Sequence, residues 1–161
     1  MTKMTTSEKG LRLIKLFEGL RLNAYLCPAG VPTIGYGHTK GVRMGQSITE
    51  AQAEELLKED LRTPERVLNA LGVNFRQDQF DALASWIFNL GEGNFRNSTL
   101  RKKILADASD EAICDQIILW VNSNKKPSTG LKKRRIAEAN LFFGKDLYYL
   151  DSKLNIKKAK I

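Results

Sequence analysis

Three side chains near the start of the chain could carry chemistry: a carboxyl at Glu18, a thiol at Cys27 and a hydroxyl at Thr33. Glu18 is expected at the end of an apolar helix. The negative end of the helix dipole and poor hydration there both favour the protonated carboxyl that a general acid requires. A solvated Glu at a helix end is the more ordinary interpretation of the same position. Residue type and position alone are therefore compatible with both roles.

Cys27 and Thr33 can likewise be interpreted as either functional or structural residues. A thiolate can act as a base or a nucleophile, but only where a nearby cation or donor lowers its pKa, and nothing near Cys27 in sequence provides one. The commonest role of a free cysteine is that of a small buried hydrophobic residue. The hydroxyl of Thr33 could orient a water molecule, yet threonine is also a good strand former.

His38 is the only histidine of the chain, which makes it an obvious candidate for a general base. A lone titratable residue more often satisfies its neighbours than it catalyses. We therefore interpret His38 as a structural residue.

The first elements that must position these residues are a helix and a small sheet. Thr5 and Glu8 have the spacing of a capping box, and the apolar periodicity that follows predicts a helix ending at about Glu18, with Gly19 as its stop. Glycines and prolines between short β-prone runs over 22–47 predict a small glycine-rich sheet.

Helix is predicted for most of the remaining chain. Thr49 and Gln52 form a second capping box ahead of an apolar stripe. Pro64 either opens a separate helix or kinks a longer one. Further helical patterns cover 67–71, 77–90, 98–105, 110–121 and 131–143. We expect one α+β domain over 1–161, with a lobe of about 1–60 that holds the first helix and the sheet, a helical lobe over 61–144, and a basic tail over 145–161.

Composition and charge narrow the class of protein. The 161 residues are 42% hydrophobic and 27% charged, as in an ordinary globular domain and unlike a disordered chain. No run reaches the roughly 18 apolar residues of a spanning helix, and the first residues lack a signal-peptide core, so we expect a chain made in the cytoplasm. Cys27 and Cys114 have no metal-ligand spacing, and we predict no disulfide and no metal site.

The net charge of +8 comes entirely from the end of the chain. Residues 125–161 carry 11 basic and three acidic side chains, whereas residues 1–124 are balanced. Such a segment is expected to bind polyanions, which include nucleic acid, an anionic membrane surface and the acidic polymers of a bacterial envelope. Net charge alone does not distinguish among these three classes of polyanion.

Four blocks of the sequence closely resemble, in order, the signature blocks of the phage-type lysozymes, the endolysin family that includes the T-even phage enzyme. The blocks are FEGLRLNAYLC, VPTIGYGH, QFDALASWIFNLG and GLKKRRIAEANLF, between residue 13 and about residue 143. In that family a Glu, eight residues, an Asp or Cys, five residues and a Thr form the catalytic set. The same spacing falls here on Glu18, Cys27 and Thr33.

The resemblance implies a lysozyme-like α+β fold and hydrolysis of the β-1,4 bond between N-acetylmuramic acid and N-acetylglucosamine in peptidoglycan, with Glu18 as general acid and no cofactor. It further implies that His38 pairs with Asp60 in the following helix, and that Arg134 or Arg135 lies near the catalytic Glu. The family's central helix suggests substrate contacts at Phe88, Asn89 and Gly91, and Ser98, which opens the next helix, is a further candidate. Because most glycosidases use a second carboxylate, the thiol at Cys27 leaves the stereochemical outcome open.

The resulting expectation is a monomeric phage or prophage endolysin that acts on peptidoglycan and contacts anionic envelope polymers through its basic C-terminus. It would be made in the host cytoplasm and reach the cell wall or periplasm at lysis with the help of a holin. A catalytically impaired peptidoglycan-binding protein of the same fold is the alternative. Nucleic-acid binding is disfavoured, because GLKKRRIAEANLF has the pattern of an amphipathic helix with its own core face and no nucleic-acid motif accompanies it.

Overall fold

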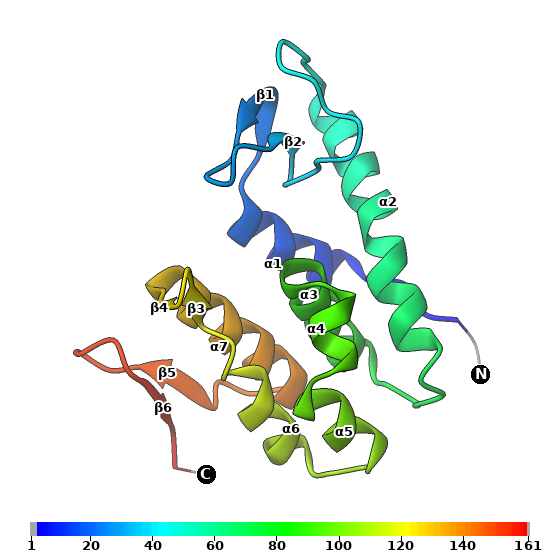
Figure 1. The fold of residues 1–161 in the computed structure, drawn as a ribbon. Coiled ribbons are helices and arrows are strands. Elements are labelled where there is room, and N and C mark those ends of the chain that lie inside the picture. Colours follow the sequence, from blue (N-terminus) through cyan, green and yellow to red (C-terminus); the bar gives the residue numbers. More distant parts are fainter. Residues whose placement is uncertain (1–2, 161) are drawn as a thin grey trace.

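The computed structural model describes residues 3–160, in which a small sheet lobe stands above a helical lobe (Figure 1). The elements in chain order are α1 (Glu8–Glu18), β1 (Arg21–Leu26), β2 (Pro32–Gly35), α2 (Glu50–Asn69), α3 (Gln77–Leu90), α4 (Glu92–Arg96), α5 (Thr99–Leu105), α6 (Asp110–Ile117), β3 (Asn122–Ser123), β4 (Lys126–Pro127), α7 (Thr129–Phe143), β5 (Tyr148–Leu150) and β6 (Ile156–Lys158). We call β1, β2 and the loop up to α2 the sheet lobe, and α3 to the C-terminal hairpin the helical lobe. The predicted α+β class with a lysozyme-like arrangement is confirmed.

The first helix ends as predicted but begins differently. Gly19 follows Glu18 at φ +72°, and its N–H donates to the carbonyl of Lys15 at 2.9 Å. The expected capping box at Thr5 is wrong, because Ser7 is the N-cap residue. The backbone N–H of Ser7 donates to the buried carboxylate of Asp81 in α3 at 2.9 Å, so a tertiary contact replaces the local cap.

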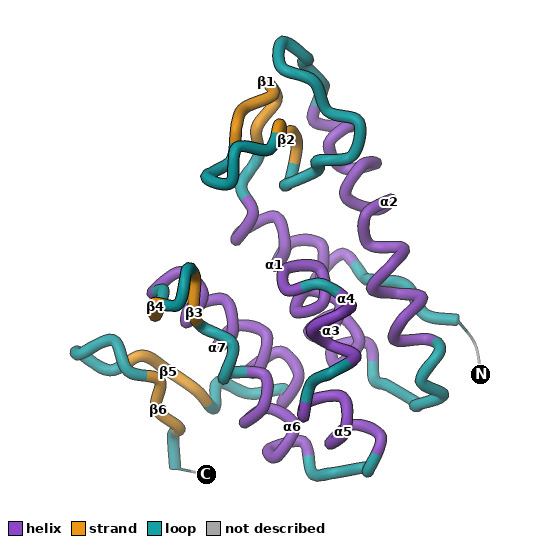
Figure 2. The backbone as a smooth tube through the Cα atoms, viewed as in Figure 1, coloured by secondary structure: helices purple, strands orange, loops and turns teal. Residues whose placement is uncertain are grey.

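The sheet lobe contains one antiparallel hairpin. Strand β1 pairs with β2, with Tyr25 opposite Thr33 and Leu26 opposite Pro32. Figure 2 shows how little of this lobe is strand, since most of the chain between β2 and α2 is loop. The predicted glycine-rich sheet is therefore present, but it is small and depends on α1 and α2 for support.

Helix α2 connects the two lobes. The Thr49–Gln52 capping box is confirmed, with both of its hydrogen bonds present. Pro64 lies buried inside a single helix of 20 residues and does not open a new one. The expected lobe boundary between residues 60 and 61 consequently falls inside a continuous helix, so the sheet lobe and the helical lobe share a rigid element.

The helical lobe is built around α3, whose residues 79–87 are all buried. Helices α1, α2 and α7 pack against it. Helix α6 ends at Ile117, short of the predicted 121, because the chain turns there toward the β3–β4 hairpin; α7 begins two residues earlier than predicted. None of the helices described between residues 3 and 160 has the length and apolar character of a membrane span.

The C-terminal segment is a hairpin and not a free tail. Leu147 and Tyr148 are 3% and 2% exposed, and the Tyr148 hydroxyl donates to the Asp115 carboxylate at 2.6 Å. The Lys158 ammonium contacts the same carboxylate oxygen at 2.9 Å, which raises the pKa of Lys158. The basic segment predicted from residue 145 onward therefore contains a hairpin, β5–β6, that packs on the helical lobe.

This packing predicts that Tyr148→Ala lowers the free energy of unfolding by about 3 kcal/mol, the usual cost of truncating a buried aromatic side chain. Tyr149, the next residue of the same strand, is 49% exposed, and Tyr149→Ala should change stability by less than about 0.5 kcal/mol. Urea unfolding of both variants measures the difference. Equal effects of the two substitutions would show that the hairpin does not stabilise the fold through Tyr148.

Candidate active site

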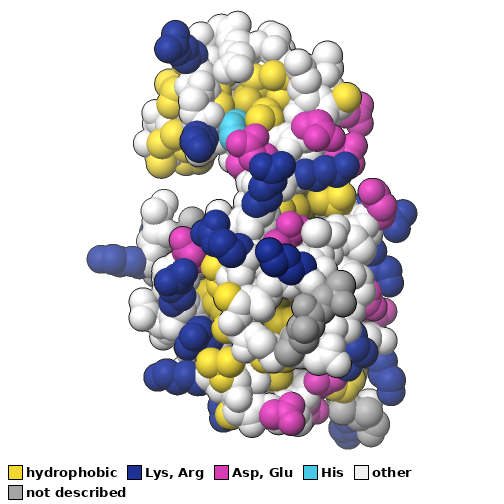
Figure 3. Space-filling model, turned by 90° about the vertical axis from the view of Figure 1, so that its right-hand side faces the viewer, with side chains coloured by type: hydrophobic (Ala, Val, Ile, Leu, Met, Phe, Trp, Pro, Cys, Tyr) yellow, Lys and Arg dark blue, Asp and Glu magenta, His cyan; other side chains and the backbone are white. Residues whose placement is uncertain are grey.

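A cleft of about 410 Å³ opens between the two lobes. It is lined by Glu18, Gly37, Thr39, Lys40, Asp60, Thr63, Pro64, Ile87, Phe88, Asn89, Gly91 and Glu92. These residues come from the end of α1, the loop after β2, the middle of α2, the end of α3 and the start of α4. In Figure 3 the molecule narrows between the two lobes, and basic and acidic side chains gather at this waist.

Glu18 is the one predicted catalytic residue that lines this cleft. Its side chain is 19% exposed, and its Oε2 accepts a hydrogen bond from Arg134 Nη1 at 2.5 Å. The other oxygen, Oε1, faces the backbone of Gly37, where an added Cβ would lie only 2.8 Å away. One carboxylate oxygen is therefore held by an arginine, and the other lies against a position that only glycine fits.

Arg134, and not Arg135, is the arginine that faces Glu18. Successive residues of a helix point about 100° apart, so the sequence alone could not choose between them. Arg134 is 3% exposed and also contacts the carbonyl of Ser85 through Nη2 at 3.3 Å. Arg135 is fully buried and points elsewhere, donating to the carbonyl of Trp120 at 3.0 Å.

Glu138 is a site residue that the sequence reasoning missed. It is fully buried on α7, one helical turn beyond both arginines, and its carboxylate binds Arg134 through Oε2 and Arg135 through Oε1. The Ser85 hydroxyl donates to Glu138 Oε2 at 2.5 Å. The spacing of two arginines followed by a Glu at i+3 and i+4 was the available signal, because residues at these spacings meet on a helix surface.

Cys27 and Thr33 lie together in the β1–β2 hairpin but are not among the residues that line the cleft. The pKa of the Cys27 thiol is lowered, mainly by the backbone N–H of Val31 and further by that of Ala29 and the Thr33 hydroxyl, against the opposing effect of partial burial. The expectation that nothing nearby supplies a donor is therefore wrong, because the turn after Cys27 folds back and presents its own N–H groups.

Thr33 is 4% exposed, and its hydroxyl has two candidate acceptors. It lies 2.9 Å from the carbonyl of Val31, and it also contributes to lowering the pKa of the Cys27 thiol. A hydroxyl has one proton to donate, so it can serve only one of these acceptors at a time.

His38 and Asp60 meet across the gap between the sheet lobe and α2. His38 Nδ1 lies 2.8 Å from Asp60 Oδ2, and Nε2 lies 2.9 Å from the carbonyl oxygen of Lys40. Both partners are acceptors, so each contact is a hydrogen bond only when the ring nitrogen facing it carries the hydrogen. His38 is 6% exposed, whereas Asp60 also lines the cleft.

Of the four expected substrate contacts, Phe88, Asn89 and Gly91 line the cleft, and Ser98 does not. Phe88 and Asn89 lie at the end of α3, and the Asn89 side-chain oxygen accepts from Arg135 Nη2. Ser98 is buried as the N-cap residue of α5, where its hydroxyl accepts from Arg101 N at 3.0 Å and donates to the Phe95 carbonyl at 2.6 Å. Its hydroxyl is thus used by the fold.

Polar residues that the sequence did not single out also line the cleft: Thr39, Lys40, Thr63 and Glu92. Thr39 and Lys40 lie on the loop after β2, whereas Thr63 belongs to α2 and Glu92 to α4, so no spacing pattern connects them. Across residues 3–160, no group of three or more His, Cys, Asp or Glu side chains is placed to hold a metal ion.

Comparison with known proteins agrees with this architecture. The sequence profile of the family described as Phage lysozyme matches residues 15–138. The endolysin of Acyrthosiphon pisum secondary endosymbiont phage 1 is 46% identical over 145 residues, which cover 86% of this chain and 98% of that protein. The endolysin of Salmonella phage P22 is 39% identical over 138 residues, covering 82% of this chain and 94% of that protein.

A solved structure, the endolysin from Escherichia coli O157:H7 phage FAHEc1, superimposes with a TM-score of 0.80 at 39% identity. The superposition covers 88% of this chain and 94% of that one. Sequence and structure agree over most of both chains, and the matched range contains Glu18, Cys27, Thr33 and Arg134. The chain therefore belongs to the phage lysozyme family.

Proposed function

We propose that this chain is a phage or prophage endolysin that hydrolyses the β-1,4 bond between N-acetylmuramic acid and N-acetylglucosamine, with Glu18 as the general acid. The observation that carries the proposal is the arrangement of Glu18 at the lip of an interlobe cleft, with one carboxylate oxygen held by Arg134 and the other facing Gly37. Fixed orientation of an acid is what proton transfer to a leaving oxygen requires.

The proton is assigned to Oε1 of Glu18. Oε2 already accepts from Arg134, so a proton there would compete with the arginine N–H for the same side of the oxygen. In the reaction this proton moves to the glycosidic oxygen as the bond from that oxygen to the anomeric carbon breaks. Water then supplies the new oxygen at that carbon, either directly or after a covalent intermediate.

Cys27 is proposed as the second reacting group, as the base that activates water or as the nucleophile. Support comes from the lowered pKa of its thiol, since a thiolate is the form that can accept a proton or attack. Thr33 assists by donating to the sulfur or by orienting the water.

His38 and Asp60 are proposed as structural residues that set the position of the loop bearing Gly37. The contact joins this loop to α2, the element shared by both lobes. Phe88 and Asn89 are proposed as substrate contacts, because they line the wall of the cleft contributed by α3.

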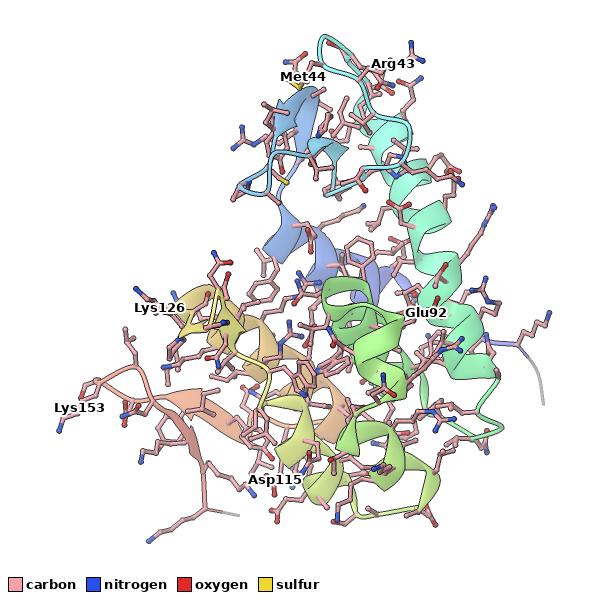
Figure 4. All side chains as sticks on the ribbon, in the orientation of Figure 1. Arg43, Met44, Glu92, Asp115, Lys126 and Lys153 are labelled. Carbon is pink, nitrogen blue, oxygen red and sulfur yellow. The ribbon has the colours of Figure 1, made fainter. Side chains whose placement is uncertain are left out.

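The basic C-terminal region is proposed to bind anionic envelope polymers. Arg134, Arg135 and Lys158 are used in internal ion pairs. Lys153 and Lys157 of the hairpin, and Lys160 just after it, are exposed. In Figure 4, Lys126 and Lys153 point outward at the edge of the molecule, on the side away from Glu92 at the cleft. This charge would hold a monomer on its substrate without entering the cleft. Cytoplasmic synthesis and release by a holin remain part of the proposal.

Glu18→Gln is expected to stay folded and to lose at least about 100-fold in peptidoglycan hydrolysis, because the amide cannot donate the proton that a general acid supplies. The matched control is Glu54→Gln, which removes a half-buried carboxyl paired with Lys15 at 2.9 Å outside the cleft and should retain activity. Mass spectrometry of digested peptidoglycan distinguishes hydrolysis, lytic transglycosylation and binding without turnover. Digestion by Glu18→Gln at the parent rate would overturn the assignment.

Gly37→Ala should reduce the turnover number by roughly 100-fold, because the new Cβ would lie 2.8 Å from Glu18 Oε1 and displace the carboxyl. Gly41→Ala is the control. Gly41 has a similar positive φ of +70°, and among the described residues no atom lies within 4 Å of its added Cβ, so it reports backbone strain alone. Equal losses in the two variants would show that strain, and not the contact with Glu18, is responsible.

Cys27→Asp should retain activity and Cys27→Ser should lose most of it, because only the first keeps an ionisable group. If the thiolate is the reactive form, parent activity rises with pH as the lowered pKa of the thiol is passed, and Cys27→Asp moves this acid limb to lower pH. Alkylation should inactivate the parent through Cys27 alone, since burial raises the pKa of Cys114 to about 12. Parent-rate cleavage by Cys27→Ser would make Cys27 a packing residue.

Replacing Lys153, Lys157 and Lys160 together by Gln should weaken binding to anionic cell-wall polymer at low ionic strength, with the difference disappearing at high salt. A triple Gln substitution at Lys58, Lys102 and Lys103 makes the same change in net charge elsewhere on the exposed surface. Sedimentation with purified walls at several salt concentrations measures both. A similar loss in the two variants would assign binding to net charge and not to the hairpin.

A further inference from the structure

Arg134, Arg135 and Glu138 form a buried ion cluster behind Glu18, and the proposed reaction assigns no role to Arg135 or Glu138. Glu138 Oε2 binds Arg134, which reaches Glu18, and Glu138 Oε1 binds Arg135, which reaches Asn89. Glu18 and Asn89 line the same cleft from α1 and α3. The Glu138 carboxylate on α7 thus binds both arginines, one of which contacts the proposed acid Glu18 and the other the proposed substrate-binding residue Asn89.

All three residues of the ion cluster are buried. Glu138 and Arg135 are fully buried, and Arg134 is 3% exposed. Burial lowers the pKa of Arg135, and the charge of Glu138 opposes this effect. Removing one partner of such a group leaves an uncompensated charge shielded from solvent, so the geometry of the remaining members depends on that partner.

The charges of the cluster partly compensate one another. Arg134 places a positive charge directly against the Glu18 carboxyl. Glu138 binds the same guanidinium at Nε, and it therefore offsets part of the positive charge that Glu18 experiences. Arg135 adds positive charge on the far side of Glu138.

We propose that Glu138 is a positioning residue for the reaction: it orients Arg134 on Glu18 and Arg135 on Asn89, and its negative charge offsets that of the two arginines. This inference rests on the proposed role of Glu18. The other charged groups around Glu18 are Lys40, Asp60 and Glu92, which line the cleft, and Asp60 is paired with His38.

The proposal predicts that the alkaline limb of the pH–activity profile moves in opposite directions in two variants. Glu138→Gln keeps the shape and an acceptor for Ser85 but removes the negative charge that offsets Arg134, so the alkaline limb of the pH–activity profile should move down by roughly one pH unit. Arg135→Met removes positive charge and should move this limb up. Arg135→Met should also raise KM roughly tenfold, because the Asn89 side chain loses its anchor.

Two controls separate this role from stability. Glu138→Asp retains the charge, so its alkaline limb should stay near that of the parent whatever the loss in turnover. Asp81→Asn changes another fully buried carboxylate, which binds Ser7 and Gln77 at the opposite end of α1 from Glu18. It should lower the melting temperature and leave the pH profile unchanged.

The experiment is the pH dependence of kcat and KM for all four variants, with melting temperatures measured in parallel. Opposite shifts of the alkaline limb in Glu138→Gln and Arg135→Met support the proposal. Unchanged profiles in folded variants overturn it, even if activity is reduced. If Glu138→Gln does not fold, an unshifted limb and unchanged KM in Arg135→Met overturn it as well. An active Glu18→Gln would instead show that the proposed function fails, which is a distinct result.

Discussion

The contact between Arg134 and Glu18 is the interaction on which the rest of this structure depends. It joins residues 116 positions apart and ties α7 to the end of α1 at the lip of the cleft. Because Arg134 is almost fully buried, its charge has to be compensated by protein groups, and Glu18 and Glu138 provide that compensation. A carboxyl that ends an apolar helix is thereby converted from a mobile surface group into an oriented one.

The cleft exists because two lobes meet along elements that belong to both. Helix α2 runs through Pro64 without interruption and carries Asp60, which reaches back to His38 in the sheet lobe. Helix α1 begins on the carboxylates of α2 and α3 and ends beside Gly37 of the sheet lobe. The small hairpin has little core of its own, so these contacts set where its residues lie relative to the helical lobe.

Charge serves different purposes in different parts of the C-terminal region. Arg134 and Arg135 belong to the buried cluster, and Lys158 fixes the terminal hairpin to α6 through Asp115. Only the exposed lysines remain for a polyanion. The family profile ends at residue 138, so the hairpin lies beyond the part of the chain that matches the family. Its packing on α6 and α7 nevertheless makes it part of the folded domain.

The sequence by itself determined the features that depend on local spacing. It predicted the end of α1 at Glu18, the Thr49–Gln52 capping box, the extent of α3 and, through four ordered blocks, the family. Only the tertiary structure decided that Ser7 and not Thr5 precedes α1, that Arg134 faces Glu18, and that Glu138 links the two arginines to both walls of the cleft. Helix periodicity tells which residues share a face of one helix, but not which distant carboxylate that face will meet. The donors around Cys27 show the same limit at short range, because the backbone N–H groups that lower its pKa are invisible in a pattern of side chains.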